Sequence, residues 1–437
     1  MEGIRGMLIE FSVTNFRSIL SRQTLGMAAN AKDDHLARNV ASAEQDVGGV
    51  LRSAVIYGPN AAGKTNLLRA LQTLQLLVVN SAVATQEGQV LPVSPFLLDK
   101  TSADRPCEFG IVFVADDATR YEYFCALTSQ RVEKEWLVAY PKGRSQRWFE
   151  REYQRDTQTY DWWFGPNFKG ERAEKKVWQE FTRSNSLFFS TAIQLNTEQL
   201  KPAFNWIAQK LIVLTAGTDL NPFLSLELLR QPDGGKEFIE FMRAADIGIE
   251  RIEVREEEFQ SQKLPAPGPG LTLQISFPQA PPGSPPPSQK VYKVLTWHKR
   301  NETGEEVPFD LSDESDGTRK LFEFTGGWLR ALTIGATLFV DELDRSLHPY
   351  ITRFLVTLFS GSKNTKGAQL IFTTHDTTLL DANLLRRDQI WFVEKDAEQS
   401  THLYPLLDYR PRKDEALERG YMKGRYGAVP MVGKLSG

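Results

Sequence analysis

Eight residues near the start of the chain have the composition and spacing of a loop that binds phosphate groups. Gly58–Thr65 reads G-P-N-A-A-G-K-T and follows the pattern G-x-x-x-x-G-K-[ST]. Glycines let backbone N–H groups close around a phosphate, the lysine can reach the outer phosphates, and the threonine hydroxyl can ligate Mg²⁺. We therefore expect the following residues to bind a nucleotide: Gly58, Asn60, Ala61, Ala62, Gly63, Lys64, Thr65 and Asn66.

Two carboxylates follow an apolar run in the C-terminal part of the chain. Thr337–Val340 reads T-L-F-V and is followed directly by Asp341 and Glu342. Such a pair can divide two tasks, because one carboxylate holds a metal ion while the other accepts a proton from an attacking water. We predict that Asp341 and Thr65 hold Mg²⁺ and that Glu342 is the general base.

A histidine ends the next apolar run, in Thr373-Thr374-His375. A lone histidine is usually structural, but here the two preceding motifs favour a role at a phosphate. We predict that His375 hydrogen-bonds the γ-phosphate and the attacking water. The predicted catalytic residues are therefore Lys64, Glu342 and His375.

The flanking sequence predicts the elements that position the loop. Met7–Phe16 alternates apolar and polar residues, as a half-buried strand does, and Leu51–Tyr57 predicts a second strand. Leucines in Asn66–Val79 recur at the spacing of one helical face, so the loop lies between a strand and a helix. Short apolar runs in Glu108–Tyr140 predict an antiparallel sheet.

The C-terminal part alternates strands with helical stretches. We expect strands at Val291–Trp297, Thr337–Val340, Gln369–Phe372 and Gln389–Val393, and a helix from about Ser315 to Ala331. This alternation predicts an α/β fold with a doubly wound sheet whose parts come from both ends of the chain. Between them, the following segments are predicted to be helices: Lys175–Phe181, Glu198–Gln209, Phe223–Leu229 and Lys236–Ala244.

Composition excludes several classes of protein. The 437 residues carry a net charge of −3, so contact with nucleic acid would need a local basic patch. Cys107 and Cys125 are the only cysteines, which excludes a disulfide scaffold and a four-cysteine zinc site and fits a reducing compartment. The apolar run Ala331–Val340 is about half of a membrane span. We expect a cytoplasmic protein without a membrane segment.

The order of the motifs resembles the ABC-type ATPase heads of the SMC, RecF and OLD class. Within that class, the chain looks most like the RloA/AbiLi group of phage-defence ATPases. Besides the loop and the carboxylate pair, the resemblance to the class rests on Asn15–Ser18, Leu311–Thr318, Val340–Asp344, Ser346–Pro349 and Thr374–His375. The resemblance to the RloA/AbiLi group rests on Asp341–Pro349 and Gly424–Pro430.

The resemblance implies a dimer in which each head completes the ATP site of the other. Ser315 and Gly317 would be the signature residues that bind the γ-phosphate in the opposite subunit, and Asp344 would be the D-loop residue that crosses the dimer. Asp316 departs from the Ser-Gly-Gly of the family, and the alternative is a plain helix start with Ser315 as N-cap. The Q-loop glutamine stays open among Gln86, Gln89 and Gln194.

The same resemblance implies four parts of the chain. We expect an N-terminal part of the head at 1–165, an inserted mainly helical lobe at 166–260, a Pro/Gly-rich loop at 261–290 and a C-terminal part of the head at 291–437. About 44 residues follow Val393, too few for the nuclease domain of OLD proteins. Any nuclease is therefore expected on a separate polypeptide.

The expected function is Mg²⁺-dependent ATP hydrolysis by a homodimer or higher homo-oligomer. The resemblance implies a sensor or regulatory ATPase in bacterial anti-phage (abortive-infection) defence, with a separately encoded effector of the RloB/AbiLii kind. The main alternative is a RecF-like DNA-repair ATPase that binds DNA directly. The soluble half of a membrane transporter and a module that holds ATP without turnover are further alternatives.

Two more segments carry expectations. Tyr140–Arg155 interleaves five basic residues with Trp148 and Tyr153, which fits either a nucleic-acid contact or a solvated sheet face. The tail Asp408–Arg425 precedes Y-G-A-V-P, and we expect it to dock onto the head or onto a partner, with a plain terminal strap as the alternative.

Overall fold

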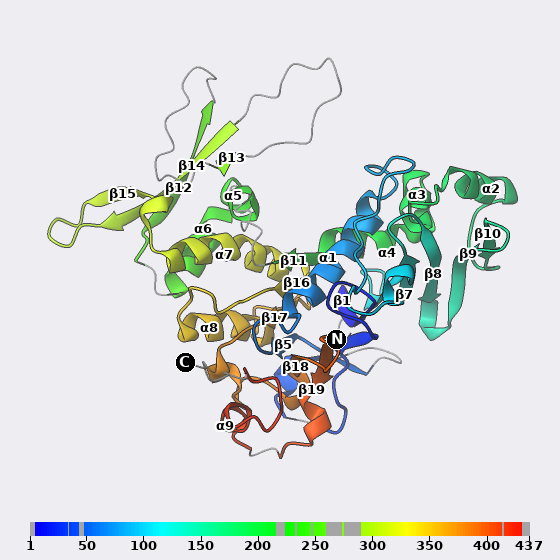
Figure 1. Ribbon diagram of the computed structural model, residues 1–437. Coiled ribbons are helices and arrows are strands. Elements are labelled where there is room, and N and C mark those ends of the chain that lie inside the picture. The colour runs from blue at the N-terminus through cyan, green and yellow to red at the C-terminus, as the bar shows by residue number, and fades with distance from the viewer. Residues whose placement is uncertain are drawn as a thin grey trace, which may run out of the picture. The chain divides into compact units, whose positions relative to one another are not determined.

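The computed structural model describes residues 5–33, 35–42, 48–215, 223–231, 234–245, 248–258, 273–274, 290–412 and 415–430 (Figure 1). These residues form two compact units. The first comprises the described residues within 1–218, 331–345 and 355–437, and the second comprises those within 219–330 and 346–354. The division near 218 falls inside the range 166–260, which was predicted to be one lobe.

The first unit contains a seven-stranded antiparallel sheet. Along its central strands, buried and less buried side chains alternate, because one face packs against helices and the other faces solvent. In the order of the sheet its strands are β10 (Thr159–Phe164), β9 (Gln146–Gln154), β8 (Val132–Tyr140), β7 (Arg120–Leu127), β6 (Cys107–Val114), β1 (Met7–Thr14) and β2 (Gln23–Gly26). The predicted hairpins are confirmed, and β9 and β10 extend them beyond Tyr140.

The first unit also contains a six-stranded, mainly parallel sheet. Its strands are β11 (Leu211–Leu214), β16 (Thr337–Val340), β17 (Gln369–Thr373), β5 (Ser53–Tyr57), β18 (Ile390–Lys395) and β19 (Thr401–Pro405), of which only β19 is antiparallel to its neighbour. Every residue of β5, β16 and β17 is buried, as expected for parallel strands covered on both faces. The carboxyl ends of these three strands therefore meet at one edge.

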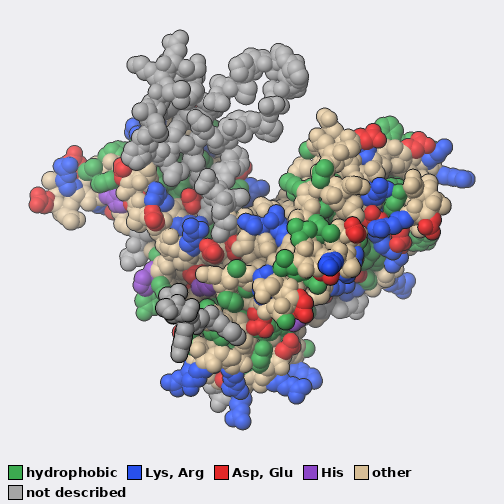
Figure 2. All heavy atoms as spheres, viewed as in Figure 1, with side chains coloured by type: hydrophobic (Ala, Val, Ile, Leu, Met, Phe, Trp, Pro, Cys, Tyr) green, Lys and Arg blue, Asp and Glu red, His purple; other side chains and the backbone are tan. Residues whose placement is uncertain are grey.

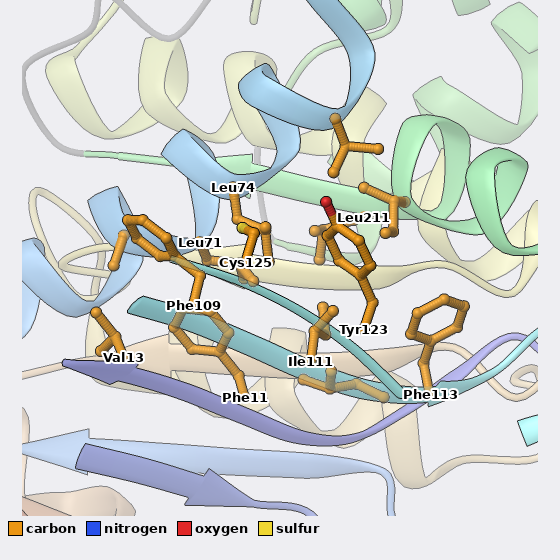
Figure 3. Close-up of a cluster of buried hydrophobic side chains, with 14 of the residues drawn as sticks. Phe11, Val13, Leu71, Leu74, Phe109, Ile111, Phe113, Tyr123, Cys125 and Leu211 are labelled. Carbon is orange, nitrogen blue, oxygen red and sulfur yellow. The ribbon is translucent and has the colours of Figure 1, made fainter. Parts of the chain in front are cut away.

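Helix α1 (Lys64–Asn80) holds the two sheets of the first unit together. It follows β5, and its buried Leu71 and Leu74 point toward Phe109 and Cys125 of the antiparallel sheet (Figure 3). This core packs α1 against both sheets. A further two-stranded ribbon is formed by β3 (Val40–Ser42) and β4 (Gly49–Leu51).

The remaining helices of the described chain are α2 (Arg172–Phe181), α3 (Phe188–Gln194), α4 (Lys201–Asn205), α5 (Phe223–Leu229), α6 (Gly234–Ala244), α7 (Asp316–Ile334), α8 (Pro349–Ser360) and α9 (Leu417–Met422). None of the helices in the described ranges is long and apolar enough to cross a membrane. The helix predicted over Glu198–Gln209 is instead a 3₁₀ turn, the short α4 and a π turn. Pro202 stands at the start of α4, where it fits only a first helical turn.

The second unit contains a sheet as well as helices. It combines helices α5 and α6 with a sheet of β12 (Arg251–Glu258), β14 (Lys290–Lys299), β13 (Leu273–Gln274) and β15 (Glu306–Asp310). Helix α5 approaches α7 so closely at Gly326 that a Cβ there would lie 2.3 Å from the Ser225 nitrogen. The Pro/Gly-rich loop predicted at 261–290 lies outside the described residues, apart from Leu273–Gln274 and Lys290.

The C-terminal tail packs onto the first unit, as expected for a tail that docks onto the head. The Tyr426 carbonyl accepts a hydrogen bond from the Tyr404 hydroxyl (3.0 Å), and the Ala428 N–H donates to a Glu394 carboxylate oxygen (2.9 Å). Tyr421 and Tyr426 both stack on Phe392 of β18. These contacts explain the aromatic and glycine content that is unusual for a disordered end.

A fully buried ion pair ties the antiparallel sheet to α3. The Glu135 carboxylate of β8 accepts from Arg151 Nε (2.9 Å), from the Tyr123 hydroxyl (3.0 Å) and from the N–H groups of Phe188 (2.7 Å) and Phe189 (2.9 Å). It thus satisfies the first two free N–H groups of α3 as well as the arginine. Removing one partner would leave the other charge buried and uncompensated.

We expect Glu135→Ala to lower the free energy of unfolding by about 3–5 kcal/mol, because Arg151 would keep a buried charge without its carboxylate. Urea denaturation measures this loss. The matched control is Glu152→Ala, whose half-exposed carboxylate pairs with Lys134 at 3.0 Å in the same sheet, and we expect it to cost less than about 1 kcal/mol. Equal losses in the two variants would contradict a special role for the buried pair.

Candidate nucleotide-binding site

The predicted phosphate-binding loop connects β5 to α1. Gly58 touches the next strand so closely that a Cβ would lie 2.3 Å from the Val393 carbonyl oxygen. Gly63 has φ +109°, and a Cβ there would lie 2.0 Å from Thr401 Oγ1. The loop can therefore keep this shape only with glycine at both positions.

Lys64 is buried, and its ammonium group is held inside the loop. Nζ donates to the carbonyl oxygens of Gly58 (2.8 Å) and Pro59 (3.1 Å) and lies 3.2 Å from His375 Nε2. Burial lowers the pKa of Lys64 below its usual value, while the carboxylates of Asp341 and Glu342 act in the opposite direction. The lysine is therefore hydrogen-bonded to the loop and lies within the electrostatic influence of the carboxylate pair.

Asp341 joins two other elements at the edge of the sheet. Its buried carboxylate accepts from Thr65 Oγ1 (2.7 Å) at the start of α1 and from Thr373 Oγ1 (2.6 Å) at the end of β17. The structure thus brings the two predicted metal-binding residues, Thr65 and Asp341, into direct contact. Sequence reasoning did not assign a role to Thr373.

Glu342 follows Asp341 in a left-handed backbone conformation, with φ +51°. This conformation is uncommon for a non-glycine residue and is often found at functional sites. The Glu342 N–H donates to Thr373 Oγ1 (2.8 Å), while the side chain reaches an ion pair with Arg345 at 3.6 Å. The backbone of the predicted base is fixed, and its carboxylate remains accessible.

His375 lies at the end of β17, next to the loop lysine. The backbone N–H of His375 donates to both carboxylate oxygens of Asp344 (3.2 Å each) in the same chain. Since the Lys64 ammonium can only donate, His375 Nε2 must be the acceptor, which leaves the ring proton on Nδ1. Partial desolvation and the charge of Lys64 lower the pKa of His375 below its usual value, against the carboxylates of Asp344 and Glu342.

A cavity of about 500 Å³ lies beside these residues. Of the predicted residues, it is lined by Asn60, Ala61, Ala62, Gly63, Lys64, Thr65, Asn66 and Glu342. Sequence reasoning missed four further residues of its wall, Ser18, Arg69, Arg345 and Lys395. Ser18 and Arg345 belong to segments that supported the family resemblance, Asn15–Ser18 and Asp341–Pro349, whereas Arg69 and Lys395 carry no sequence signal.

Ser18 and Thr401 support the loop from outside. Thr401 Oγ1 donates to the Ala62 carbonyl (2.9 Å) and contacts Ser18 Oγ (2.8 Å), and Asn66 Nδ2 donates to the same Ser18 oxygen (2.8 Å). These contacts join residues that are 383 positions apart in the sequence. The N-terminal and C-terminal parts of the chain therefore shape the loop together.

The predicted signature residues lie in the second unit, at the start of α7. Ser315 Oγ accepts a hydrogen bond from the Thr318 N–H (3.1 Å). Ser315 therefore makes the contact of an N-cap residue, which was the alternative to a signature role. The Asp316 carboxylate is exposed and paired with Arg319. The Glu314 carboxylate, just before the signature, is held by His298 Nε2 (2.6 Å).

None of the three candidates for the Q-loop glutamine lines the cavity. Gln86, Gln89 and Gln194 are absent from its lining. The carbonyl oxygens of Gln86 and Gln89 instead accept from the Asn185 amide, at 2.7 and 3.0 Å.

The basic stretch Tyr140–Arg155 does not form one surface for nucleic acid. Arg151 is fully buried in its pair with Glu135, and Trp148 is 5% exposed. On the exposed face, Arg147 pairs with Glu150, and Figure 2 shows basic and acidic side chains interspersed over this part of the molecule. Of the two interpretations left open, a solvated sheet face with paired charges fits these contacts, because Arg151 and Trp148 are not available at the surface.

The antiparallel lobe, the doubly wound sheet and the phosphate-binding loop between β5 and α1 define an ABC-type P-loop ATPase head, which confirms the predicted fold class. The chain belongs to the family described as "AAA domain, putative AbiEii toxin, Type IV TA system", which matches residues 53–381. This range contains the loop, the carboxylate pair and His375. Membership of an ATPase family implies use of a nucleotide and usually of Mg²⁺.

Solved structures of SMC heads are similar over most of the chain. An SMC head bound to the C-terminal winged-helix domain of ScpA has 11% identity and a TM-score of 0.41, with 91% of this chain and 96% of that chain covered. The SMC head domain of Thermotoga maritima has 14% identity and a TM-score of 0.38, covering 92% and 99%. A Pyrococcus furiosus SMC head with an extended coiled coil, bound to the C-terminal domain of ScpA, has 11% identity and a TM-score of 0.38, covering 91% and 95%. No curated protein matches the chain.

The lowered pKa of His375 makes a testable prediction about pH. Because the folded protein holds this ring neutral below pH 6.5, the unfolded chain binds more protons there, and stability is lost as the pH falls from 6.5 through the folded pKa. We expect an NMR titration of His375 to give a midpoint below 6.5. In Lys64→Met the midpoint should rise, since the neighbouring charge is gone, and an unchanged midpoint would exclude electrostatic contact between the two side chains.

Proposed function

We propose that the protein is an Mg²⁺-dependent ATPase whose heads dimerise around ATP, and that it acts as a sensor or regulatory ATPase in anti-phage defence. The observation that carries the enzymatic part is the contact of Asp341 with both Thr65 and Thr373, beside Lys64. Membership of an ATPase family supports it.

The loop and its lysine would bind the phosphates. The N–H groups at the start of α1 and the positive end of its dipole favour an anion there. The Lys64 ammonium already lies within the loop and can exchange its contact with His375 for a phosphate oxygen. Gly63 is consistent with a phosphate-binding loop, because a side chain there would collide with Thr401 and Ser18, which hold the loop in place.

Thr65 and Asp341 would hold Mg²⁺. A hydroxyl and a carboxylate are hard oxygen ligands of the kind Mg²⁺ prefers. Here they lie 2.7 Å apart, and Thr65 lines the cavity. When bound, the ion would neutralise charge that develops on the phosphate oxygens. Thr373 would orient the Asp341 carboxylate by its hydrogen bond.

Glu342 would accept the proton of the attacking water. Its backbone is held by Thr373 and its carboxylate lines the cavity, so the base is fixed in direction but reachable by solvent. His375, neutral and protonated at Nδ1, would change its hydrogen-bond partner when a γ-phosphate is present. Binding of ATP would thus affect the segment around Asp344, because the His375 backbone N–H is hydrogen-bonded to the Asp344 carboxylate.

The dimer would complete each site with the start of α7 from the other subunit. The Ser315 hydroxyl and the N–H groups near Gly317 lie at a helix N-terminus, where an anion is favoured. The exposed Asp316 is neutralised by Arg319, which reduces its repulsion of a phosphate. Asp344 would contact the partner at the same interface.

The defence role rests on the family description and on the resemblance to the RloA/AbiLi group. The description of the matched family names an AbiEii toxin and a type IV toxin–antitoxin system. We propose that the ATPase controls a separately encoded effector of the RloB/AbiLii kind, with nuclease activity, in the cytoplasm. Hydrolysis would set how long the dimer keeps that effector restrained or active.

We expect Lys64→Ala to abolish ATP hydrolysis, because the loop would lose the ammonium that binds the outer phosphates. Phosphate release measures this loss, and the plating efficiency of phage on cells that express the variant with its neighbouring genes tests the defence role. The control is Lys176→Ala, an exposed lysine of α2 paired with Glu180. Unchanged phosphate release in Lys64→Ala would refute the site, and unchanged protection alone would refute the defence role.

We expect Glu342→Gln to bind ATP but to hydrolyse it about 10²–10⁴-fold more slowly, because the amide cannot accept the water proton. Since ATP would persist, dimers should accumulate, and size-exclusion chromatography with light scattering should detect them in saturating Mg-ATP. Monomers under these conditions would contradict dimerisation of the isolated protein. A wild-type rate in the variant would contradict the role of Glu342.

A further inference from the structure

We propose that Arg345 is a γ-phosphate ligand supplied by the same chain, and that it leaves Glu342 when ATP binds. This inference rests on the proposed function, because it assigns a new residue to the same cavity. Arg345 lies within Asp341–Pro349, which supported the resemblance to the RloA/AbiLi group, but sequence reasoning assigned it no role at the site.

The position of Arg345 is set by the turn that follows β16. Its N–H donates to the Glu342 carbonyl (3.0 Å), and the Leu343 N–H between them donates to the Thr373 carbonyl (3.0 Å). The turn is thus anchored to β17 on one side. The Arg345 side chain lines the cavity together with Lys64, Thr65 and Glu342.

The guanidinium has donors to spare. Within the described part of the chain, its side chain forms one ion pair, Nη1 to Glu342 Oε2 at 3.6 Å, and is 60% exposed. An arginine carries five N–H donors, arranged to bind two oxygens of a phosphate at once. Lys64, by contrast, already has three contacts within the chain, to Gly58, Pro59 and His375.

The present ion pair is of a kind that a phosphate can replace. At 3.6 Å and with both side chains exposed by more than a third, it is screened by water and contributes little. A terminal phosphate carries more charge than a carboxylate and accepts paired hydrogen bonds from a guanidinium. We therefore expect the γ-phosphate to win the competition for Arg345.

The exchange would have two consequences. The Glu342 carboxylate would lose its cation and become free to accept a proton from water. ADP has no γ-phosphate and would leave the pair intact, so Arg345 would contribute to the affinity for the triphosphate and not for the diphosphate. The ion pair would then couple the recognition of ATP to the release of the base.

The experiment compares affinities for Mg-AMP-PNP and Mg-ADP by isothermal titration calorimetry in the full-length protein. In Arg345→Ala we expect the affinity for AMP-PNP to fall about tenfold, with the affinity for ADP unchanged, as for loss of one charged hydrogen-bonded contact. Arg345→Lys keeps the charge without the paired donors and should lose less. Equal losses for both nucleotides, or no loss for AMP-PNP, would overturn the inference.

Arg22→Ala is the matched control. Arg22 pairs with Glu10 at 3.7 Å, with exposures of 63% and 39% against 60% and 37% for Arg345 and Glu342, and it does not line the cavity. We expect it to leave both affinities unchanged. If the wild-type protein itself binds neither nucleotide, the proposed function fails, whereas an unchanged AMP-PNP to ADP ratio in Arg345→Ala with normal wild-type binding refutes this inference alone.

Discussion

The buried carboxylate of Asp341 is the contact on which the arrangement of the site depends. It ends β16 and accepts hydrogen bonds from Thr65, which begins α1, and from Thr373, which ends β17. The parallel register of the three strands brings these ends to one edge, but register alone does not fix side chains. With both carboxylate oxygens engaged, the loop, the carboxylate pair and the histidine segment are held in one geometry. Thr373 extends this control to Glu342 by accepting its backbone N–H.

A second constraint acts on the other side of the loop. Ser18 and Thr401 come from opposite ends of the chain, yet both contact the loop, and the space they fill excludes any side chain at Gly63. A loop fixed between Asp341 and Thr401 needs little reorganisation to accept an anion, and this preorganisation avoids an entropic cost on binding. The discontinuity of the head in sequence is therefore part of how the loop is shaped.

The sequence predicted the parts of the site that depend on local order, and missed those that depend on pairing between distant segments. Glycine spacing and an apolar strand before Asp341 specify their surroundings within about ten residues, and the structure brings the predicted residues Lys64, Thr65, Asp341 and Glu342 together. The burial of Arg151 could not be predicted, because its partner Glu135 comes from another strand and their meeting depends on sheet register. Helical periodicity in Glu198–Gln209 was overridden at Pro202. In the sheet of the second unit, the strand predicted at Val291–Trp297 lies within β14, whereas β12 was missed because most of its residues are charged.

The cavity shows why a site of this kind can be both preformed and selective. The groups that would meet a phosphate already have partners of their own, since Lys64 contacts His375 and Arg345 contacts Glu342. A ligand gains only the difference between its own contacts and those it replaces, so a neutral or weakly charged molecule gains little. The buried contacts of Lys64 are costly to replace, whereas the exposed pair of Arg345 is not. In the mechanism that we propose, recognition would therefore proceed in two stages: the loop would provide general affinity for phosphate, and the exposed pair of Arg345 and Glu342 would respond to the number of phosphates present.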